Sequence, residues 1–225
     1  MIPWEILDSA PVPGSRAEIR LHRHGDEFSI TVDGKELMNS RLHGSEEDLA
    51  SIACSRFAKR AGPRVLVGGL GMGFTLSAAL TRLPADAEVV VAELTPKVVE
   101  WNRGPLAHLA GRPLEDRRVT VFEGDVADVL KARIAAFDAV LLDVDNGPEG
   151  FTRKGNDWLY ARSGLTAAFA ALRPQGVLSV WSASPDAAFM RRIRGVGFQV
   201  AELRVPAAGI RGGRKHTIWL AWRTS

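Results

Sequence analysis

Apolar side chains first alternate with polar ones along this chain and later form short unbroken runs. The alternation covers 18–37, where apolar residues occupy every second position on either side of a turn at 24–27. A period of two around a turn with Gly and Asp predicts a β-hairpin. The preceding stretch, 1–16, has three prolines and no period, so we expect an irregular lead-in there.

Helical periods and apolar runs alternate from residue 45 onward. We expect a helix to begin at Ser45, with this serine as its cap, and to end at 61–63. Repeated strand–helix units then predict an α/β fold, in which a mostly parallel sheet is covered by helices on both faces. The last two strands are too close in sequence for a helix between them, which predicts an antiparallel pair. The expected strands cover 65–67, 88–93, 118–122, 137–143, 176–181, 198–205 and 216–222. The expected helices cover 74–83, 126–133, 157–172 and 185–194, with one more beginning at 95–96.

We therefore divide the chain into an N-terminal lead-in and β-hairpin element, 1–44, and one α/β domain, 45–225. Hydrophobic residues make up 46% of the 225 positions and charged residues 24%, which is typical of a globular protein. The formal net charge is only +3 and basic residues are scattered, so we expect no nucleic-acid partner. We also expect no membrane segment, no signal peptide and a cytoplasmic location.

A glycine-rich loop joins the first parallel strand to its helix. Gly69, Gly71 and Gly73 form a G-x-G-x-G pattern, which allows a tight turn and close approach of a ligand to the N-terminus of a helix. Glu93 ends the next strand twenty positions after Gly73, the spacing at which a carboxylate meets the hydroxyl groups of a ribose. Dinucleotide sites prefer G-x-G-x-x-G, so an adenosine ligand without phosphate fits this loop better than NAD.

Acidic residues follow the next two strands. Asp125 can accept from the amino group of adenine while the backbone N–H of Val126 donates to a ring nitrogen, or Asp125 can instead cap the following helix. Asp143 and Asp145 lie two positions apart at the end of the fourth strand and would share one side of an extended chain. Paired carboxylates at this edge suit a cationic or amine substrate, which they can orient and deprotonate. Plain solvation of a loop is the alternative.

The order of these motifs resembles the spermidine synthase-like branch of the S-adenosylmethionine (SAM)-dependent transferases. The resemblance covers nearly the whole chain and is carried by 32–34, the glycine loop, Glu93, 124–125, Asp143, 159–160, 172–177 and 215–219. It implies a Rossmann-like fold, SAM or decarboxylated SAM as co-substrate, no metal, and a homodimer through the N-terminal strands. The implied reaction alkylates a small amine-containing acceptor by in-line displacement at the sulfonium carbon.

The same resemblance implies roles for individual residues. The glycine loop and Glu93 would hold the nucleoside, and Asp125 the adenine. Asp143 would accept or relay the proton of the attacking amine, while Asp145 and Tyr160 would orient the acceptor. The acceptor site would be completed by His43, Asn146 and Trp158.

Several features depart from the aminopropyltransferase pattern, and one of them is that the Gln and the Tyr-His pair that usually follow the hairpin have no clear match in 37–49. The Asp of the usual G-G-G-D-G-G loop, which faces the aminopropyl ammonium, falls on Gly71, and the second Asp of the usual D-S-S-D-P falls on Asn146. A usual Gln after the fifth strand is replaced by Trp181 or its neighbours. Losing the loop Asp removes repulsion toward the carboxylate of intact SAM and so shifts the expected donor toward SAM. Two alternatives therefore stay open: a SAM-dependent methyltransferase acting on an unknown small molecule, and a non-catalytic nucleoside-binding or assembly protein.

Overall fold

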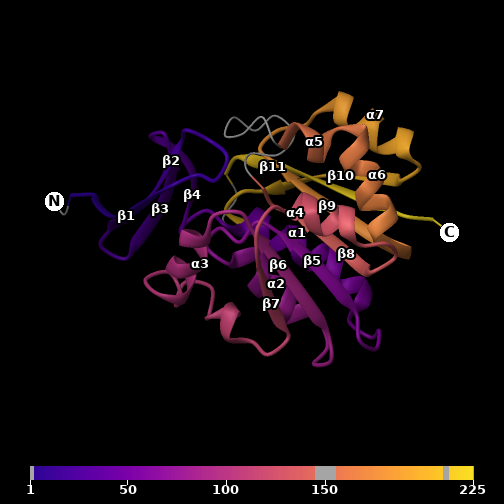
Figure 1. Cartoon of the computed structure of the whole chain (residues 1–225), viewed down its shortest axis with the longest axis horizontal. Coiled ribbons are helices and arrows are strands. Elements are labelled where there is room, and N and C mark those ends of the chain that lie inside the picture. Colours follow the sequence, from indigo (N-terminus) through magenta and orange to yellow (C-terminus); the bar gives the residue numbers. More distant parts are fainter. Residues whose placement is uncertain (1–2, 145–155, 210–212, 225) are drawn as a thin grey trace.

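Two β-sheets organise the molecule. The computed structural model describes residues 3–144, 156–209 and 213–224. One sheet is antiparallel with the order β1-β2-β3-β4, and the other has seven strands in the order β10-β11-β9-β8-β5-β6-β7. The smaller sheet stands beside the larger one, and the two chain termini lie at opposite ends (Figure 1).

The smaller sheet contains the predicted hairpin and extends it on both sides. Its strands are β1 (Glu5–Pro11), β2 (Glu18–His24), β3 (Glu27–Val32) and β4 (Lys35–Asn39). The expectation of an irregular lead-in over 1–16 is wrong, because β1 pairs antiparallel with β2. The sequence pattern did not reveal this strand because most of its side chains are exposed at the edge of the sheet, where apolar and polar residues need not alternate.

The larger sheet follows the predicted strand–helix order. Its strands are β5 (Arg64–Gly68), β6 (Glu88–Glu93), β7 (Val119–Glu123), β8 (Phe137–Leu142), β9 (Leu172–Ser182), β10 (Gln199–Pro206) and β11 (Lys215–Trp222). The strands from β7 to β9 along the sheet are parallel, and β10 and β11 form the predicted antiparallel pair. The helices are α1 (Gly44–Cys54), α2 (Phe74–Arg82), α3 (Pro96–Arg103), α4 (Val126–Ala132), α5 (Asn156–Tyr160), α6 (Arg162–Ala171) and α7 (Ala187–Val196).

Two helix predictions need correction. The helix at 45 ends at Cys54, well before 61–63, and its cap position is His43, because the Ser45 hydroxyl bonds to other side chains. The helix expected over 157–172 is two helices, α5 and α6, separated by Ala161 in an extended conformation. The expected division of the chain falls in the first turn of α1, and it stays a prediction.

The larger sheet is covered on both faces, as its apolar strands predicted. Val65 and Val67 of β5 pack into the cluster that includes α1, α2 and α3, while Leu66 packs into the cluster of α4, α6 and α7. Figure 1 shows these two groups of helices on opposite sides of the sheet. None of the helices among the described residues has the length and apolar character needed to span a membrane.

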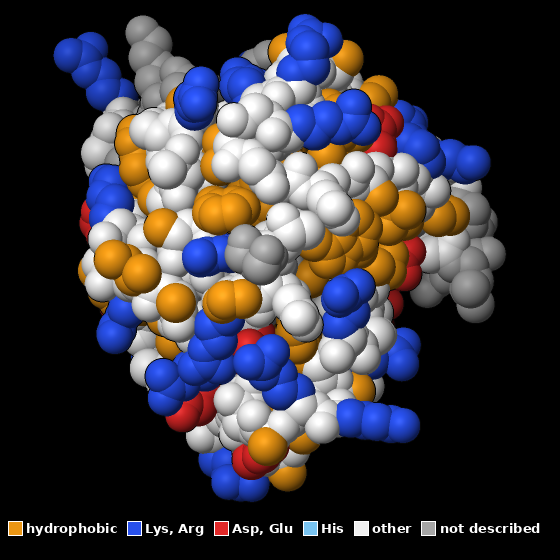
Figure 2. Space-filling model, turned by 90° about the vertical axis from the view of Figure 1, so that its right-hand side faces the viewer, with side chains coloured by type: hydrophobic (Ala, Val, Ile, Leu, Met, Phe, Trp, Pro, Cys, Tyr) orange, Lys and Arg blue, Asp and Glu red, His pale blue; other side chains and the backbone are white. Residues whose placement is uncertain are grey.

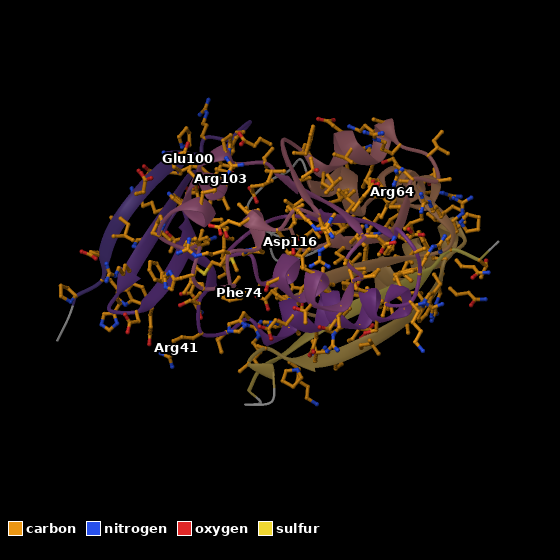
Figure 3. The ribbon with its side chains drawn as sticks, turned by 90° about the horizontal axis from the view of Figure 1, so that it is seen from below. Arg41, Arg64, Phe74, Glu100, Arg103 and Asp116 are labelled. Atoms are coloured by element: carbon orange, nitrogen blue, oxygen red, sulfur yellow. The ribbon has the colours of Figure 1, made fainter. Side chains whose placement is uncertain are left out.

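The strand order places a topological switch point beside β5. From β5 the chain adds β6 and β7 on one side of the sheet and β8 and β9 on the other. Loops that leave neighbouring strands in opposite directions open a crevice at the carboxyl ends of those strands. Figure 3 shows Phe74, which begins α2 after β5, on the side of the smaller sheet, whereas Arg64 at the start of β5 lies on the far side. The smaller sheet therefore stands over the crevice.

The surface in Figure 2 faces away from the smaller sheet. Lys and Arg side chains occur at many separate places on this face, between apolar and neutral groups. No single basic patch dominates it.

A buried carboxylate anchors the opposite end of β8. The Asp138 side chain is 0% exposed, and its Oδ2 accepts from Arg173 Nη1 and from the backbone N–H of Arg64, both at 2.8 Å. Arg60 Nη1 lies 3.1 Å from Oδ1. Because Asp138→Ala would leave these donors without their partner, we expect it to lower the free energy of unfolding by about 3 kcal/mol in urea titrations.

Asp128→Ala is the matched control for this prediction. Asp128 is exposed and pairs with Lys131 at 3.5 Å. Its loss should change the free energy of unfolding by less than about 0.5 kcal/mol. Equal losses in the two variants would contradict the anchoring role of Asp138.

Candidate functional site

The glycine loop lies between the end of β8 and the smaller sheet. Gly69 has φ 89°, and a Cβ there would overlap the carbonyl oxygen of Asp143. Gly71 has φ 52°, and its Cβ would lie 2.7 Å from Met38 Sδ of β4. Both positions therefore need glycine for two reasons, a left-handed backbone and the absence of space. The loop presents its backbone directly to the crevice.

Glu93 holds this loop in place. Its side chain is buried, Oε2 accepts from the backbone N–H of Leu70 at 2.9 Å, and Oε1 accepts from the backbone N–H of Thr95 at 2.8 Å. One carboxylate thus ties the glycine loop to the first turn of α3. The sequence spacing did not reveal this structural task, which comes in addition to the position of Glu93 on the cavity wall.

Asp125 takes the capping role that was left open. Its Oδ1 accepts from the backbone N–H of Ala127 at 2.9 Å at the start of α4. Asp125 also lines the crevice, together with Val126.

The crevice between the two sheets contains a cavity. The sequence-predicted residues on its wall are Gly69, Gly71, Glu93, Asp125, Val126 and Asp143. The smaller sheet supplies an apolar wall that includes Ile19, Ile30, Val32, Leu37 and Met38. A ligand in this cavity would meet the carboxylates on one side and hydrocarbon on the other.

Two carboxyl groups from distant parts of the chain line the same cavity. Asp143 follows β8, and its Oδ2 accepts from Thr75 Oγ1 of α2 at 2.5 Å. Glu46, in the first turn of α1, is only 7% exposed, and its Oε2 lies 2.6 Å from Ser45 Oγ. Burial raises the pKa of Asp143 to about 6, although the Thr75 hydroxyl opposes this rise. Burial and then the charge of Asp143 raise the pKa of Glu46 to about 8.

Other predicted residues lie outside the cavity wall. His43 stacks on Phe74 with ring centroids 4.0 Å apart, and its Nδ1 lies 2.8 Å from Glu47 Oε1. Tyr160 is buried and donates from its hydroxyl to the carbonyl oxygen of Val144 at 3.1 Å. It therefore holds the backbone just after Asp143.

Three more predictions concern the loop after β8. Trp158 packs against the core on the α4–α6 side, with Lys131 Nζ 4.5 Å from the centre of its ring. Asp145 and Asn146 lie outside the described residues.

Gly73, the last glycine of the predicted loop pattern, caps α2 with φ 86° and does not line the cavity.

Sequence reasoning missed several cavity residues. Glu46 and Met38 were given no role from the sequence, and Trp181 was considered only as the replacement of a usual Gln. Trp181 lines the cavity, and its Nε1 donates to Ser45 Oγ at 3.0 Å. The signal that the sequence offered for Glu46 was a carboxylate in a helix that precedes the first parallel strand. A single sequence does not show that this carboxylate lies near Asp143.

No candidate metal centre emerges from the part of the chain that the structure describes. There, no group of three or more His, Cys, Asp or Glu side chains converges on a point where an ion could sit.

Comparison with known proteins defines the class. Residues 43–190 match the family model described as the spermine/spermidine synthase domain. The chain belongs to this family. The polyamine aminopropyltransferases of Mycobacterium tuberculosis H37Rv and Mycobacterium bovis are each 30% identical to it over 204 residues, which cover 85% of this chain. The chain spans only 37% of the length of these relatives.

Solved structures confirm the fold. A spermidine synthase from Thermotoga maritima superposes with a TM-score of 0.76 at 20% identity, over 97% of this chain and 72% of that one. A spermidine synthase in complex with the transition-state analogue AdoDATO gives 0.75 at 19% identity, with the same coverage. A putative O-methyltransferase from Klebsiella pneumoniae gives 0.55 at 22% identity, over 80% of each chain. The expected Rossmann-like α/β architecture is confirmed.

The raised pKa of Glu46 predicts how stability depends on pH. Between pH 6 and 8 the folded chain keeps a proton on Glu46 that the unfolded chain has lost, since the usual pKa of Glu is 4.5. The ligand-free protein should therefore lose up to about 1.4 kcal/mol of unfolding free energy per pH unit in this window. Glu46→Gln lacks this titration, so its decline should be flatter. Urea unfolding at pH 6, 7 and 8 measures both slopes, and parallel slopes would show that Glu46 is not the group responsible.

Proposed function

We propose that this chain transfers an aminopropyl group from decarboxylated SAM to a small acceptor amine. The observation that carries this proposal is the cavity at the switch point, where the glycine loop and Glu93 face Asp143 and Glu46. Membership of the spermine/spermidine synthase domain family supports the same reaction class. A homodimer, which the resemblance implies, and a cytoplasmic location, which was expected from the sequence, belong to the proposal as well.

The reaction needs an unprotonated amine placed in line with a carbon on the sulfonium. The nitrogen lone pair forms the new C–N bond, the C–S bond breaks, and its electron pair stays on sulfur. The leaving methylthioadenosine is neutral, so no general acid is needed for it. The amine loses one proton to a carboxylate, and much of the rate comes from holding the two reactants in line.

The site residues fit these needs. Gly69 and Gly71 allow the nucleoside to approach the backbone, and Glu93 is placed to accept from the ribose hydroxyls while it holds the loop. Asp143, kept in position by Thr75, provides the negative charge that attracts a cationic acceptor. Apolar side chains of the smaller sheet exclude water, which strengthens such charge interactions.

A second function has one specific observation in its favour. In the family pattern a carboxylate stands at the position of Gly71, but here the space next to Gly71 is taken by the thioether of Met38. No loop carboxylate at this position neutralises an aminopropyl ammonium or repels the carboxylate of intact SAM. Methyl transfer from SAM to a small molecule is therefore the alternative.

The products separate the two functions. The protein is incubated with decarboxylated SAM or with SAM and a panel of amines, and mass spectrometry identifies the nucleoside released. Aminopropyl transfer releases methylthioadenosine and adds an aminopropyl group to the amine, whereas methyl transfer releases S-adenosylhomocysteine. Asp143→Asn should lower kcat at least about 100-fold, with the Kd of methylthioadenosine, which has no positive charge, changed less than threefold.

Asp128→Asn, an exposed aspartate on α4, is the control and should retain the wild-type kcat. Full turnover in Asp143→Asn would overturn the role given to Asp143. Donor binding without transfer to any acceptor would favour the non-catalytic alternative.

A further inference from the structure

Hydrogen bonds lead from the cavity wall toward the outside of the molecule. Glu46 lines the cavity, and its Oε2 lies 2.6 Å from Ser45 Oγ. The same hydroxyl lies 2.8 Å from Nδ1 of His216 on β11. Ser45 is completely buried, whereas His216 is partly exposed. A carboxyl group in the cavity is therefore connected to a surface imidazole through a single serine.

The hydrogen-bond capacity of Ser45 limits how this chain can be arranged. A hydroxyl has one hydrogen to donate and two lone pairs that accept. Trp181 Nε1 can only donate, and at 3.0 Å it occupies one lone pair of Ser45 Oγ. Ser45 must therefore donate to one of its other two neighbours, Glu46 or His216, and accept from the other.

The two permitted arrangements differ in the direction of both hydrogen bonds. With Glu46 ionised, Ser45 donates to the carboxylate and His216 donates from Nδ1 to Ser45. With Glu46 protonated, the carboxyl group donates to Ser45, and Ser45 donates to an unprotonated Nδ1. In the second arrangement the carboxyl hydrogen of Glu46 can move to Ser45 Oγ while the hydroxyl hydrogen of Ser45 moves to His216 Nδ1. Glu46 then becomes a carboxylate and His216 an imidazolium. Loss of the Nε2 proton to water then gives the first arrangement, so one proton has left the cavity.

We propose that Glu46 takes the proton of the acceptor amine and that Ser45 and His216 carry it out of the cavity. This inference rests on the proposed function, because an acceptor that arrives as an ammonium ion must release one proton before its nitrogen can be alkylated. It divides the work between the two acids of the cavity wall. Asp143 remains the charged group that attracts the acceptor, and Glu46 is the base.

The surroundings of Glu46 favour this division. Thr75 donates to Asp143 and opposes the rise of its pKa, whereas burial and the neighbouring charges of Asp143 and Glu47 raise the pKa of Glu46. Glu46 is therefore the stronger base of the two. A sulfonium donor in the cavity adds a positive charge, which lowers the pKa of Glu46. Glu46 is then deprotonated and can accept the proton of the acceptor amine.

The surroundings of His216 favour release of the proton. Its ring packs edge-on against Trp181, with centroids 4.7 Å apart. Burial, Arg214 and Arg204 all lower its pKa, so an imidazolium there is short-lived. The proton rests on Glu46 and passes through His216 only on its way to water.

Substitutions in the middle and at the end of the relay test the proposal. Ser45→Ala removes the hydroxyl, and His216→Gln removes the titrating ring. We expect each to lower kcat 10- to 100-fold at pH 7, with the KM of the donor changed less than twofold. The loss should shrink at pH 9 and above, because more of the acceptor amine arrives unprotonated. Ser51→Ala, a partly buried serine of the same helix, is the control and should keep the wild-type profile.

The outcomes are distinct. Wild-type kcat and pH profile in both variants would overturn the relay, and so would a loss that is equal at every pH, because that pattern indicates a purely structural role. Thermal unfolding and calorimetric titration with the donor show whether each variant is folded.

A wild-type protein that transfers nothing would overturn the proposed function. In that case the relay is judged by infrared difference spectra, in which the carboxyl band of Glu46 is the one missing from Glu46→Gln. The midpoint of its titration should shift in Ser45→Ala, and an unchanged midpoint would overturn the relay on its own.

Discussion

Burying a carboxyl group costs free energy unless hydrogen bonds or opposite charges compensate. Three carboxyl groups of the cavity wall, two buried and one partly buried, meet this requirement differently. Glu93 is satisfied by two backbone N–H groups, and this satisfaction fixes the glycine loop. Asp143 has the hydroxyl of Thr75, and Glu46 has that of Ser45. Burial raises the pKa values of Glu46 and Asp143 more than these hydroxyl groups lower them, so both acids favour a proton or a cationic ligand nearby. The free-energy cost of burying these carboxyl groups therefore relates the fold to the charge of the ligand that the cavity favours.

The smaller sheet makes the constraint effective. It stands over the carboxyl ends of the parallel strands and covers the acids with aliphatic side chains. Low polarity around the acids increases both the cost of leaving them ionised and the attraction they exert on a cation. Met38 shows how closely the two sheets approach, because its thioether excludes any side chain at Gly71.

Much of the fold could be predicted because its signals are local. Unbroken apolar strands and periodic helices predicted the α/β order, and Glu93 was expected at the end of a strand, where β6 indeed ends. The edge strand β1 was missed because exposed strand residues need no alternation. The partners of Glu46 were missed for a different reason. Asp143 and His216 lie far from it in sequence, and only the packing of α1 against β8, β9 and β11 brings them together. Packing also showed that Tyr160 holds backbone and that Ser45 does not cap α1.

The central claim is that this cavity holds a cationic adenosine derivative through Glu93, Glu46 and Asp143. Calorimetric titration of the wild type and of Glu93→Gln with SAM, decarboxylated SAM and methylthioadenosine tests it most directly. We predict that one of the two sulfonium donors binds at least 10-fold more tightly than neutral methylthioadenosine, because the acids attract its charge. Glu93→Gln should weaken binding of all three ligands, because Glu93 serves the part they share. Equal affinity of the wild type for the three ligands, or no binding of any, would contradict the account.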